Sequence, residues 1–372
     1  MVTALLGVAA ARAYPTTDLF CFVTAAHLVT TGADPYDAAV WSDATAGVHP
    51  DYRGAMRPSP CPGRFGYPLW TAIVLVPLVW LDTSVVGFVW QLLLFGGTAI
   101  GVVFLSRVLR AGIAPWLTLA VALSQPFWLT VLNAQFGGIL LGALGAATYF
   151  ATRSRDLAAG LSLALGWLKP HVMLVALLAI PLRALRSGRT ATAIAALGAV
   201  VVAALASIVV RPSWPSEYAT ELLQNRASQT LASTSLVGLS SFFVGSIVPG
   251  VLASIAVVAA AVLLLRSRAL TDLDTLAVAV SATLVLSPYL GSHDQLLLAP
   301  AWARMLASRA SQGFPIVGLL AITLPWTLYA FRNVIGGPEG LAGLLPAITL
   351  IALAVVIGRD VRVSVREKSL AS

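Results

Sequence analysis

Residues 14–68 read YPTTDLFCFVTAAHLVTTGADPYDAAVWSDATAGVHPDYRGAMRPSPCPGRFGYP and form the longest polar stretch in a chain of apolar runs. Five of the fifteen acidic residues of the chain lie in this stretch. The first of them, Asp18, lies close to the end of the preceding apolar run. An ionisable side chain near the lipid boundary costs free energy and indicates a functional site. The stretch is therefore the first place to look for chemistry.

The composition around this stretch is that of a polytopic membrane protein. The chain is 58% hydrophobic and 10% charged, with a mean hydropathy of +0.88, whereas soluble domains carry about 25% charged residues. A spanning backbone must satisfy its own hydrogen bonds in lipid, so the apolar runs are expected to be helices. The net charge of +8 comes from short Arg clusters between the runs, which is the positive-inside pattern. These Arg clusters lack the interleaved aromatic residues of a nucleic-acid-binding site.

The apolar runs predict a single all-α membrane domain over residues 1–372, with about twelve transmembrane helices and both termini cytoplasmic. The Arg clusters fall on one face if the run over residues 68–81 is re-entrant, and this arrangement obeys the positive-inside rule. Residues 14–68 are then the first extracytoplasmic loop. The predicted spans cover residues 1–13 (in part), 84–107, 115–133, 136–152, 157–168, 170–183, 190–210, 247–266, 273–290, 294–308, 314–331 and 341–358.

Two local features are expected in the first loop. Residues 19–31 form an interfacial helix, with Asp18 as its N-cap and Gly32 as its end. The two cysteines of the chain, Cys21 and Cys61, both lie in this loop. An oxidising compartment would permit a disulfide between them. Sequence alone does not bring the two side chains together, so a bond and two separate thiols both remain open.

Asp18 and Lys169 are the leading candidate site residues. An N-cap accounts for Asp18 by itself, because Asp is among the best caps, but a capping carboxylate can also face a cavity and act as a base. Lys169 lies in an apolar run and belongs to no cytoplasmic cluster. It is either a snorkelling Lys at a helix end or a buried cation that pairs with phosphate.

Four further polar residues on the same predicted face each allow two interpretations. His293, between two predicted helices, is either an ordinary loop residue or a proton carrier and phosphate ligand. Asn133 and Gln135 either hydrogen-bond a sugar or stabilise a turn. Arg226, in a polar outer loop, either binds phosphate or is simply solvated.

Some motifs are absent, and this narrows the chemistry. The sequence has no glycine-rich phosphate loop and no dinucleotide fingerprint. It also has no HExxH or CxxC pair that would indicate a zinc site. We therefore expect no metal and no cofactor, and a sugar donor other than a nucleotide sugar.

The order of several short motifs resembles glycosyltransferase family 87, a group of GT-C membrane enzymes of actinobacteria that use polyprenyl-phosphate sugars. The motifs extend from residue 18 to about residue 300. Each is short, and the resemblance rests on their order. They are Asp18, Ala25-Ala26, Gly32-Ala33-Asp34-Pro35-Tyr36, Phe65-Gly66-Tyr67-Pro68, Asn133-Ala134-Gln135, Lys169-Pro170 and Ser287-Pro288 followed by His293.

The resemblance implies a GT-C bundle in the plasma (inner) membrane with its active site on the extracytoplasmic face. The implied reaction transfers mannose from polyprenyl-phosphate-mannose to a glycolipid or lipoglycan, in α-1,2 linkage and with inversion. Asp18 corresponds to the catalytic base and His293 to the active-site histidine. The remaining candidates are substrate-binding residues: Lys169 and Arg226 for the donor phosphate, and Tyr67, Asn133, Gln135, Asp34 and Tyr36 for the substrates more generally.

Three alternatives to this activity stay open, one of which is a structural or assembly subunit without activity. The same family contains an arabinofuranosyltransferase, so polyprenyl-phosphate-arabinose is a second donor. A lipid or sugar transporter or flippase is a different class, in which inverted repeats and broken helices meet at the membrane midplane. The sequence shows no such repeat, and its polar groups gather on one face.

Overall fold

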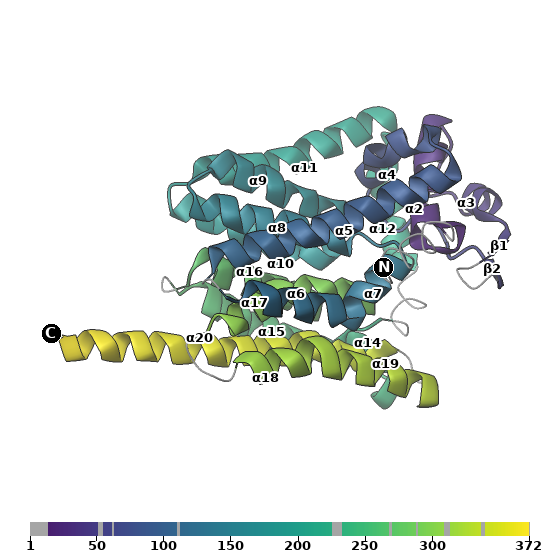
Figure 1. The fold of residues 1–372 in the computed structure, drawn as a ribbon. Helices are drawn as coiled ribbons and strands as arrows, with labels where there is room; N and C mark the ends of the chain where they lie inside the picture. Colours follow the sequence, from purple (N-terminus) through teal and green to yellow (C-terminus); the bar gives the residue numbers. More distant parts are fainter. Residues whose placement is uncertain are drawn as a thin grey trace.

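The computed structural model describes residues 14–50, 55–61, 63–109, 112–224, 233–267, 270–287, 289–308, 313–335 and 339–371. The partial span predicted over residues 1–13 lies outside this range. The described chain is an elongated bundle of helices, with α20 projecting from one end and the short elements of the first loop gathered at the other (Figure 1).

The helices follow one another with short connections. The elements at the first-loop end are η1 (Tyr14–Thr16), α2 (Asp18–Thr30), α3 (Ala38–Thr45), β1 (Val48–Pro50), β2 (Met56–Pro58), α4 (Leu69–Leu75) and η2 (Val76–Trp80). The central elements are α5 (Thr83–Val108), α6 (Ala114–Leu123), α7 (Gln125–Leu132), α8 (Gly137–Thr152), α9 (Asp156–Ala164), η3 (Leu165–Leu168), α10 (Pro170–Arg186), α11 (Thr190–Val210) and α12 (Trp214–Gln224). The last elements are α14 (Leu236–Val244), α15 (Val248–Leu265), α16 (Asp272–Leu286), η4 (Ser292–Leu298), α17 (Ala299–Leu306), α18 (Gly313–Val317), the π-helical η5 (Gly318–Thr323), α19 (Leu324–Ile335), η6 (Glu339–Gly343) and α20 (Leu344–Ala371).

Glycines set the packing of α5 against α8. A Cβ placed on Gly97 of α5 would lie 2.6 Å from the carbonyl oxygen of Gly138. A Cβ on Gly145 of α8 would lie 2.7 Å from the carbonyl oxygen of Gly101. Only residues without a side chain allow two helix backbones to approach so closely. This contact fixes the N-terminal end of α8, where the turn that carries Gln135 ends.

Five helical stretches among the described residues are long and apolar enough to cross a membrane, and a sixth results if the bent pair α6–α7 is one span. The five stretches are Thr83–Val108, Thr190–Val210, Val248–Leu265, Gly313–Arg332 and Leu341–Val363. The structure thus agrees with an all-α membrane protein, whereas the number of twelve spans stays a prediction. The span predicted over residues 115–133 is divided into two helices that meet at 58°, since a new helix begins at Gln125, with Ser124 as its N-cap and Pro126 in its first turn.

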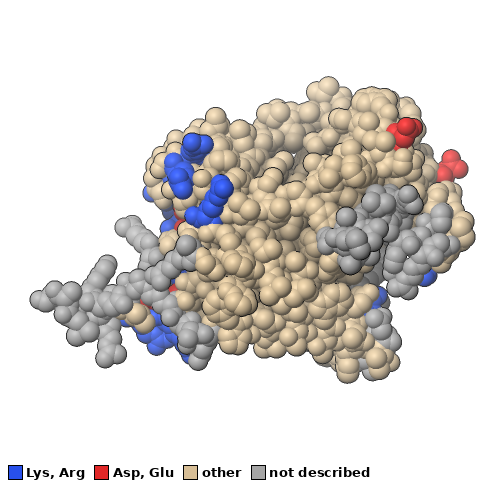
Figure 2. Space-filling view, in the orientation of Figure 1, with Lys and Arg blue, Asp and Glu red and all other residues tan. Residues whose placement is uncertain are grey.

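Charged residues separate toward the two ends of the bundle. In Figure 2, most visible Lys and Arg gather at the end near the projecting α20, with a little acidic surface among them, and an uncharged band separates this end from the larger acidic patches at the other end. At the basic end, Arg189 forms a bidentate ion pair with Asp272, at 2.8 and 2.9 Å. Arg304 lies 2.6 Å from Asp274 and 2.8 Å from Asp360. These pairs connect α10–α11, α16, α17 and α20 at that end.

The first loop departs from its prediction in two details. Helix α2 ends near Gly32 as expected, and Gly32 adopts a positive φ of 73°. However, Asp18 is not the N-cap: Thr17 occupies that position, and the Asp18 carboxylate accepts a hydrogen bond from Gln135 instead. The loop also contains a short antiparallel β1–β2 pair, which an all-α prediction does not include.

The two cysteines, whose pairing the sequence left open, form a disulfide. Cys21 on α2 bonds to Cys61, with their Cα atoms 5.4 Å apart. The bond attaches α2 to the segment that leads into α4. Trp41 strengthens the same connection, because its indole nitrogen donates to the carbonyl oxygen of Cys61 at 3.3 Å. The disulfide and this hydrogen bond therefore hold α2, α3 and the segment at Cys61 together at the first-loop end of the bundle.

Candidate active site

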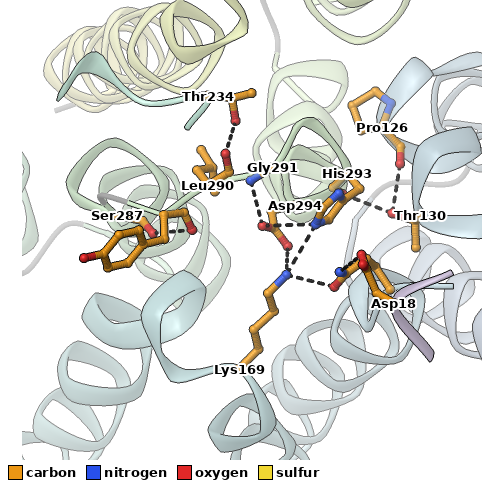
Figure 3. A network of polar contacts seen from close by, with 12 residues as sticks. Asp18, Pro126, Thr130, Lys169, Thr234, Ser287, Leu290, Gly291, His293 and Asp294 are labelled. Atoms are coloured by element: carbon orange, nitrogen blue, oxygen red, sulfur yellow. Dashed lines mark hydrogen bonds and ion pairs between the residues drawn. The ribbon is translucent and has the colours of Figure 1, made fainter. Parts of the chain in front are cut away.

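Polar side chains from four separate parts of the chain meet at the first-loop end of the bundle. Asp18 begins α2, Gln135 lies between α7 and α8, Lys169 precedes α10, and His293 and Asp294 lie in η4. Figure 3 shows the ammonium group of Lys169 at the centre of this network, with Asp294 and His293 on one side and Asp18 reached through a further side chain on the other. The sequence motifs thus converge in space as expected for a membrane active site.

A tight turn after α7 positions Gln135 and Asp18 together. Ala134 takes a left-handed conformation with φ 50°, and the backbone N–H of Gln135 donates to the carbonyl oxygen of Thr130 at 3.0 Å, which closes the end of the helix. The indole of Trp90 donates to the carbonyl oxygen of Ala134 at 2.8 Å. The turn is therefore rigid, and its Asn133 carbonyl oxygen accepts the backbone N–H of Asp18 at 3.1 Å.

Gln135 links the carboxylate of Asp18 to the ammonium group of Lys169. Its amide nitrogen donates to Oδ2 of Asp18, and its Oε1 accepts from Lys169 Nζ at 3.0 Å. A lysine ammonium only donates and a carboxylate only accepts, so these two partners fix the orientation of the amide. Asp18 is half-buried, and in the described part of the chain its Oδ1 has no hydrogen-bond partner.

Lys169 is buried by the break between η3 and α10. Pro170 starts the new helix and turns the Lys side chain inward, where it is 2% exposed. Its Nζ lies 2.6 Å from Asp294 Oδ1 and 3.5 Å from His293 Nε2. A buried cation persists only when it is paired and hydrogen-bonded, and Asp294 supplies most of that compensation. The interpretation of Lys169 as a snorkelling residue is therefore wrong.

His293 and Asp294 are positioned by Gly291. The backbone N–H of Gly291 donates to Asp294 Oδ2 at 3.1 Å, so Asp294 stabilises the start of η4. The imidazole of His293 lies over Gly291, since a Cβ there would be 2.7 Å from Nδ1. His293 Nε2 lies 3.5 Å from both the Lys169 ammonium and Asp294 Oδ2.

Burial and the lysine determine the charge states of the cluster. Burial raises the pKa of Asp18, although the Gln135 hydrogen bond and Lys169 act in the opposite direction. Burial lowers the pKa of His293 to about 4, because the attraction of Asp294 does not offset desolvation and the Lys169 charge. His293 is therefore neutral at pH 7. Burial would raise the pKa of Asp294, but Lys169 and the neighbouring histidines lower it to about 2.

A cavity of about 200 Å³ opens beside this network. Drug-sized ligands occupy pockets of roughly 300–1,000 Å³, so the space suits a single sugar ring. Asp18 is not among the wall residues and is connected to them through Gln135. The wall is made by Gly66, Tyr67, Gln135, Lys169, His171, Glu221, Leu222, Tyr289, Gly291, His293 and Asp294.

The other predicted site residues have different positions. Tyr67 lines the cavity, and its carbonyl oxygen accepts the Tyr36 hydroxyl at 2.7 Å. Tyr36 is buried, and Asp34 pairs with Arg211 at 2.5 Å, so both support the wall from outside it. The side chain of Asn133 is also outside the wall. Arg226 lies outside the described residues. For all of these, substrate binding stays a prediction.

Sequence reasoning overlooked two features. Glu221 lines the cavity, but nothing in its spacing on a polar segment distinguished it from other loop acids. Asp272 and Asp274 form a D-x-D pair at the opposite end of the bundle. Asp272 is paired with Arg183 and Arg189, and Asp274 with Arg304, so neither carboxylate is open to a nucleotide–metal complex. In the described part of the chain, no three His, Cys, Asp or Glu residues are grouped closely enough to hold a metal ion.

Comparison with known proteins gives one match. The model of glycosyltransferase family 87 matches residues 65–288, which is more than half of the chain. The matched region contains Tyr67, Gln135 and Lys169, whereas Asp18 and His293 lie on either side of it. No curated protein and no solved structure matches the chain.

Proposed function

The chain belongs to glycosyltransferase family 87, and we propose that it transfers mannose from polyprenyl-phosphate-mannose to a hydroxyl of a glycolipid or lipoglycan. The proposed product has an α-1,2 linkage, and the active site faces the extracytoplasmic side of the plasma membrane. The observation that carries this proposal is the half-buried Asp18 carboxylate, which is connected through Gln135 to Lys169 at a cavity of sugar size.

In the proposed reaction Asp18 is the general base. The acceptor hydroxyl oxygen attacks the anomeric carbon, and its proton passes to the unpartnered Oδ1 of Asp18. The bond between the anomeric carbon and the donor phosphate oxygen breaks, and the phosphate leaves with the electron pair. A single displacement of this kind inverts the anomeric configuration. Burial raises the pKa of Asp18, which brings a base closer to the operating pH and makes it more effective.

Lys169 and His293 serve the leaving phosphate in this proposal. Lys169 is a cation on the cavity wall, and its ammonium is shared between Asp294 and Gln135. A phosphate that enters the cavity competes with Asp294 for that charge. His293, neutral at pH 7, contributes a hydrogen bond rather than a charge. Fixed donors aimed at developing charge in a water-poor site are an effective form of transition-state stabilisation. Arg226 remains a further candidate for the phosphate.

Two observations support the proposed sidedness. The Arg-rich end of the bundle is opposite to the cavity, and positive residues remain on the cytoplasmic side. The Cys21–Cys61 disulfide lies at the cavity end, and disulfides persist in oxidising compartments.

Thiol labelling of intact cells tests this orientation. Both native cysteines are bonded and should not react, so Ala46→Cys near α3 and Ser187→Cys at the α10–α11 turn provide single reporters. An impermeant maleimide should label Ala46→Cys and spare Ser187→Cys. Labelling of Ser187→Cys alone would reverse the orientation and contradict the proposed face.

Membership of the family sets aside the transporter or flippase alternative, because the family consists of glycosyltransferases. Polyprenyl-phosphate-arabinose remains the competing donor. The direct test offers purified protein both radiolabelled donors with glycolipid acceptors, and it includes Asp18→Asn as the inactive control. Transfer of mannose by wild type only would support the proposal. Transfer of arabinose only, or of neither sugar, would refute it.

A further inference from the structure

Glu221 is a buried carboxylate on the cavity wall for which the mechanism has no role. It lies on α12 and is only 2% exposed. Its Oε1 has no hydrogen-bond partner within the described part of the chain. Buried polar atoms in native proteins are nearly always hydrogen-bonded, so an exception needs an explanation. Because Glu221 also lines the cavity, a ligand there is one source of the donor that its carboxylate lacks.

The position of Glu221 is fixed by the contacts of its helix. Trp214, at the start of α12, packs edge-on against Trp70 with ring centroids 5.2 Å apart. The hydroxyl of Tyr289, another wall residue, donates to the carbonyl oxygen of Leu222 at 3.1 Å. Tyr218 contacts Tyr36 at 6.2 Å. Since three separate parts of the chain hold α12, the carboxylate is preorganised at the cavity and is not the end of a mobile surface side chain.

The nearest cation compensates Glu221 only in part. Arg64 Nε lies 3.8 Å from Oε2, which is longer than a hydrogen bond. Glu217, one helical turn earlier, is the contrasting case: Arg211 donates to its two oxygens at 2.6 and 2.8 Å. Two glutamates on one short helix thus contrast: Glu217 is partly exposed and paired within the protein, whereas Glu221 is buried at the cavity without a close partner.

The charges on the cavity wall indicate which kind of hydrogen-bond donor would pair with Glu221. Glu221 is itself acidic and its nearest cation, Arg64, is 3.8 Å away, so the donor phosphate is expected at Lys169 and a neutral group is favoured beside Glu221. The cavity has room for one sugar ring, whose hydroxyl groups are neutral donors. We propose that the Glu221 carboxylate accepts a hydrogen bond from a ring hydroxyl of the sugar in the cavity, and that this bond selects the sugar. The inference rests on the proposed glycosyl transfer.

The transferred sugar and the terminal acceptor sugar offer the same chemistry, and deoxy substrates distinguish them. We would measure kcat/KM for wild type, Glu221→Gln, Glu221→Ala and the control Glu217→Gln. One series uses donors that lack a single hydroxyl, and the other uses acceptors that lack a single hydroxyl. A hydrogen bond to a charged group implies that wild type loses about 10- to 100-fold for one hydroxyl position.

We expect kcat/KM of Glu221→Ala for the natural substrate to fall by a similar factor. For the deoxy substrate that lacks the bonded hydroxyl, kcat/KM of Glu221→Ala should fall no further. Glu217→Gln should keep the full wild-type discrimination. If Glu221→Ala no longer discriminates in the donor series, the bonded hydroxyl belongs to the donor. If it no longer discriminates in the acceptor series, the hydroxyl belongs to the acceptor. If Glu221→Ala discriminates at every hydroxyl position as wild type does, the proposal is wrong. Glu221→Gln keeps the side-chain volume and should show a partial loss of discrimination if Glu221→Ala does not fold.

Failure of the proposed transfer would be recognised separately, by direct binding. Saturation-transfer NMR with methyl α-mannoside and methyl α-arabinofuranoside needs no turnover. Binding to wild type and to Glu217→Gln, together with loss of binding in Glu221→Ala, supports the sugar site even if neither polyprenyl donor reacts. Equal binding to all three proteins, or no binding to wild type, would overturn it.

Discussion

The substitution Asp18→Asn separates the catalytic role of this residue from every structural one. The helix cap is Thr17, so the change removes no cap. An asparagine oxygen can still accept the Gln135 amide, which keeps the connection to Lys169. The properties lost are the ability to take a proton and the negative charge of the carboxylate. General-base catalysis contributes roughly 10²–10⁴-fold, and we expect kcat/KM to fall by that factor, which corresponds to about 2.7–5.4 kcal/mol of transition-state stabilisation.

The stability of the same variant should change in the opposite direction. Burial raises the pKa of Asp18 in the folded protein, so the folded state disfavours the carboxylate relative to the unfolded chain. The resulting penalty is absent below the unfolded pKa, grows as the pH rises toward the folded pKa, and persists at neutral pH. Asparagine carries no charge and avoids this penalty. Asp18→Asn should therefore be at least as stable as wild type at pH 7 and lose that advantage in acid.

The assay combines initial rates of mannose transfer with thermal unfolding in detergent, each measured from pH 4 to pH 8. Wild-type kcat/KM should fall as the pH drops through the raised pKa of Asp18, because the protonated acid is no base. Asp37→Asn is the matched control: Asp37 caps α3 in the same loop, and Asn caps about as well. A stable Asp18→Asn protein with near wild-type transfer would remove Asp18 from the mechanism.

Two further substitutions test the connections around the site. Lys169→Met leaves Asp294 buried without its partner, which should lower the free energy of unfolding by about 3–5 kcal/mol. Adding Asp294→Asn to the same chain should recover part of this loss. Unchanged thermal unfolding of Lys169→Met alone would contradict the buried ion pair. Replacement of both Cys21 and Cys61 by serine opens a loop with a sequence separation of 40. It should cost about 4 kcal/mol in the chain-entropy model. Mass spectrometry after alkylation without reductant should find both wild-type thiols protected, and two alkylated cysteines would disprove the bond.

The sequence predicted the helices better than their membrane crossings. The helices expected over residues 84–107, 190–210 and 247–266 end within one residue of those observed, because long apolar runs bounded by charge leave little choice. Hydropathy cannot foresee the bend at Ser124. It also cannot decide whether a short apolar helix crosses the membrane, since that depends on neighbours far away in the sequence.

Candidate site residues could be selected from the sequence where their position was anomalous. A lysine isolated in an apolar run pointed to Lys169, and an acid at a lipid boundary pointed to Asp18. Glu221 lies among other polar residues, so only its burial at a cavity wall identifies it. The partner of Lys169 was equally hidden, because Asp294 comes from 125 positions further along the chain.

The arrangement of charges explains why Gln135 stands between Asp18 and Lys169. A lysine in direct contact with Asp18 would strongly favour the carboxylate form and lower its pKa, which would weaken the base. With a neutral amide between them, the positive charge of Lys169 is opposed mainly by Asp294, at 2.6 Å, and burial keeps the pKa of Asp18 raised. Gln135 still transmits orientation, since its two ends are fixed by the two charged groups. The same buried network can thus hold a fully ionised pair, Lys169 and Asp294, beside a carboxylate that remains basic enough to accept a proton from a sugar hydroxyl.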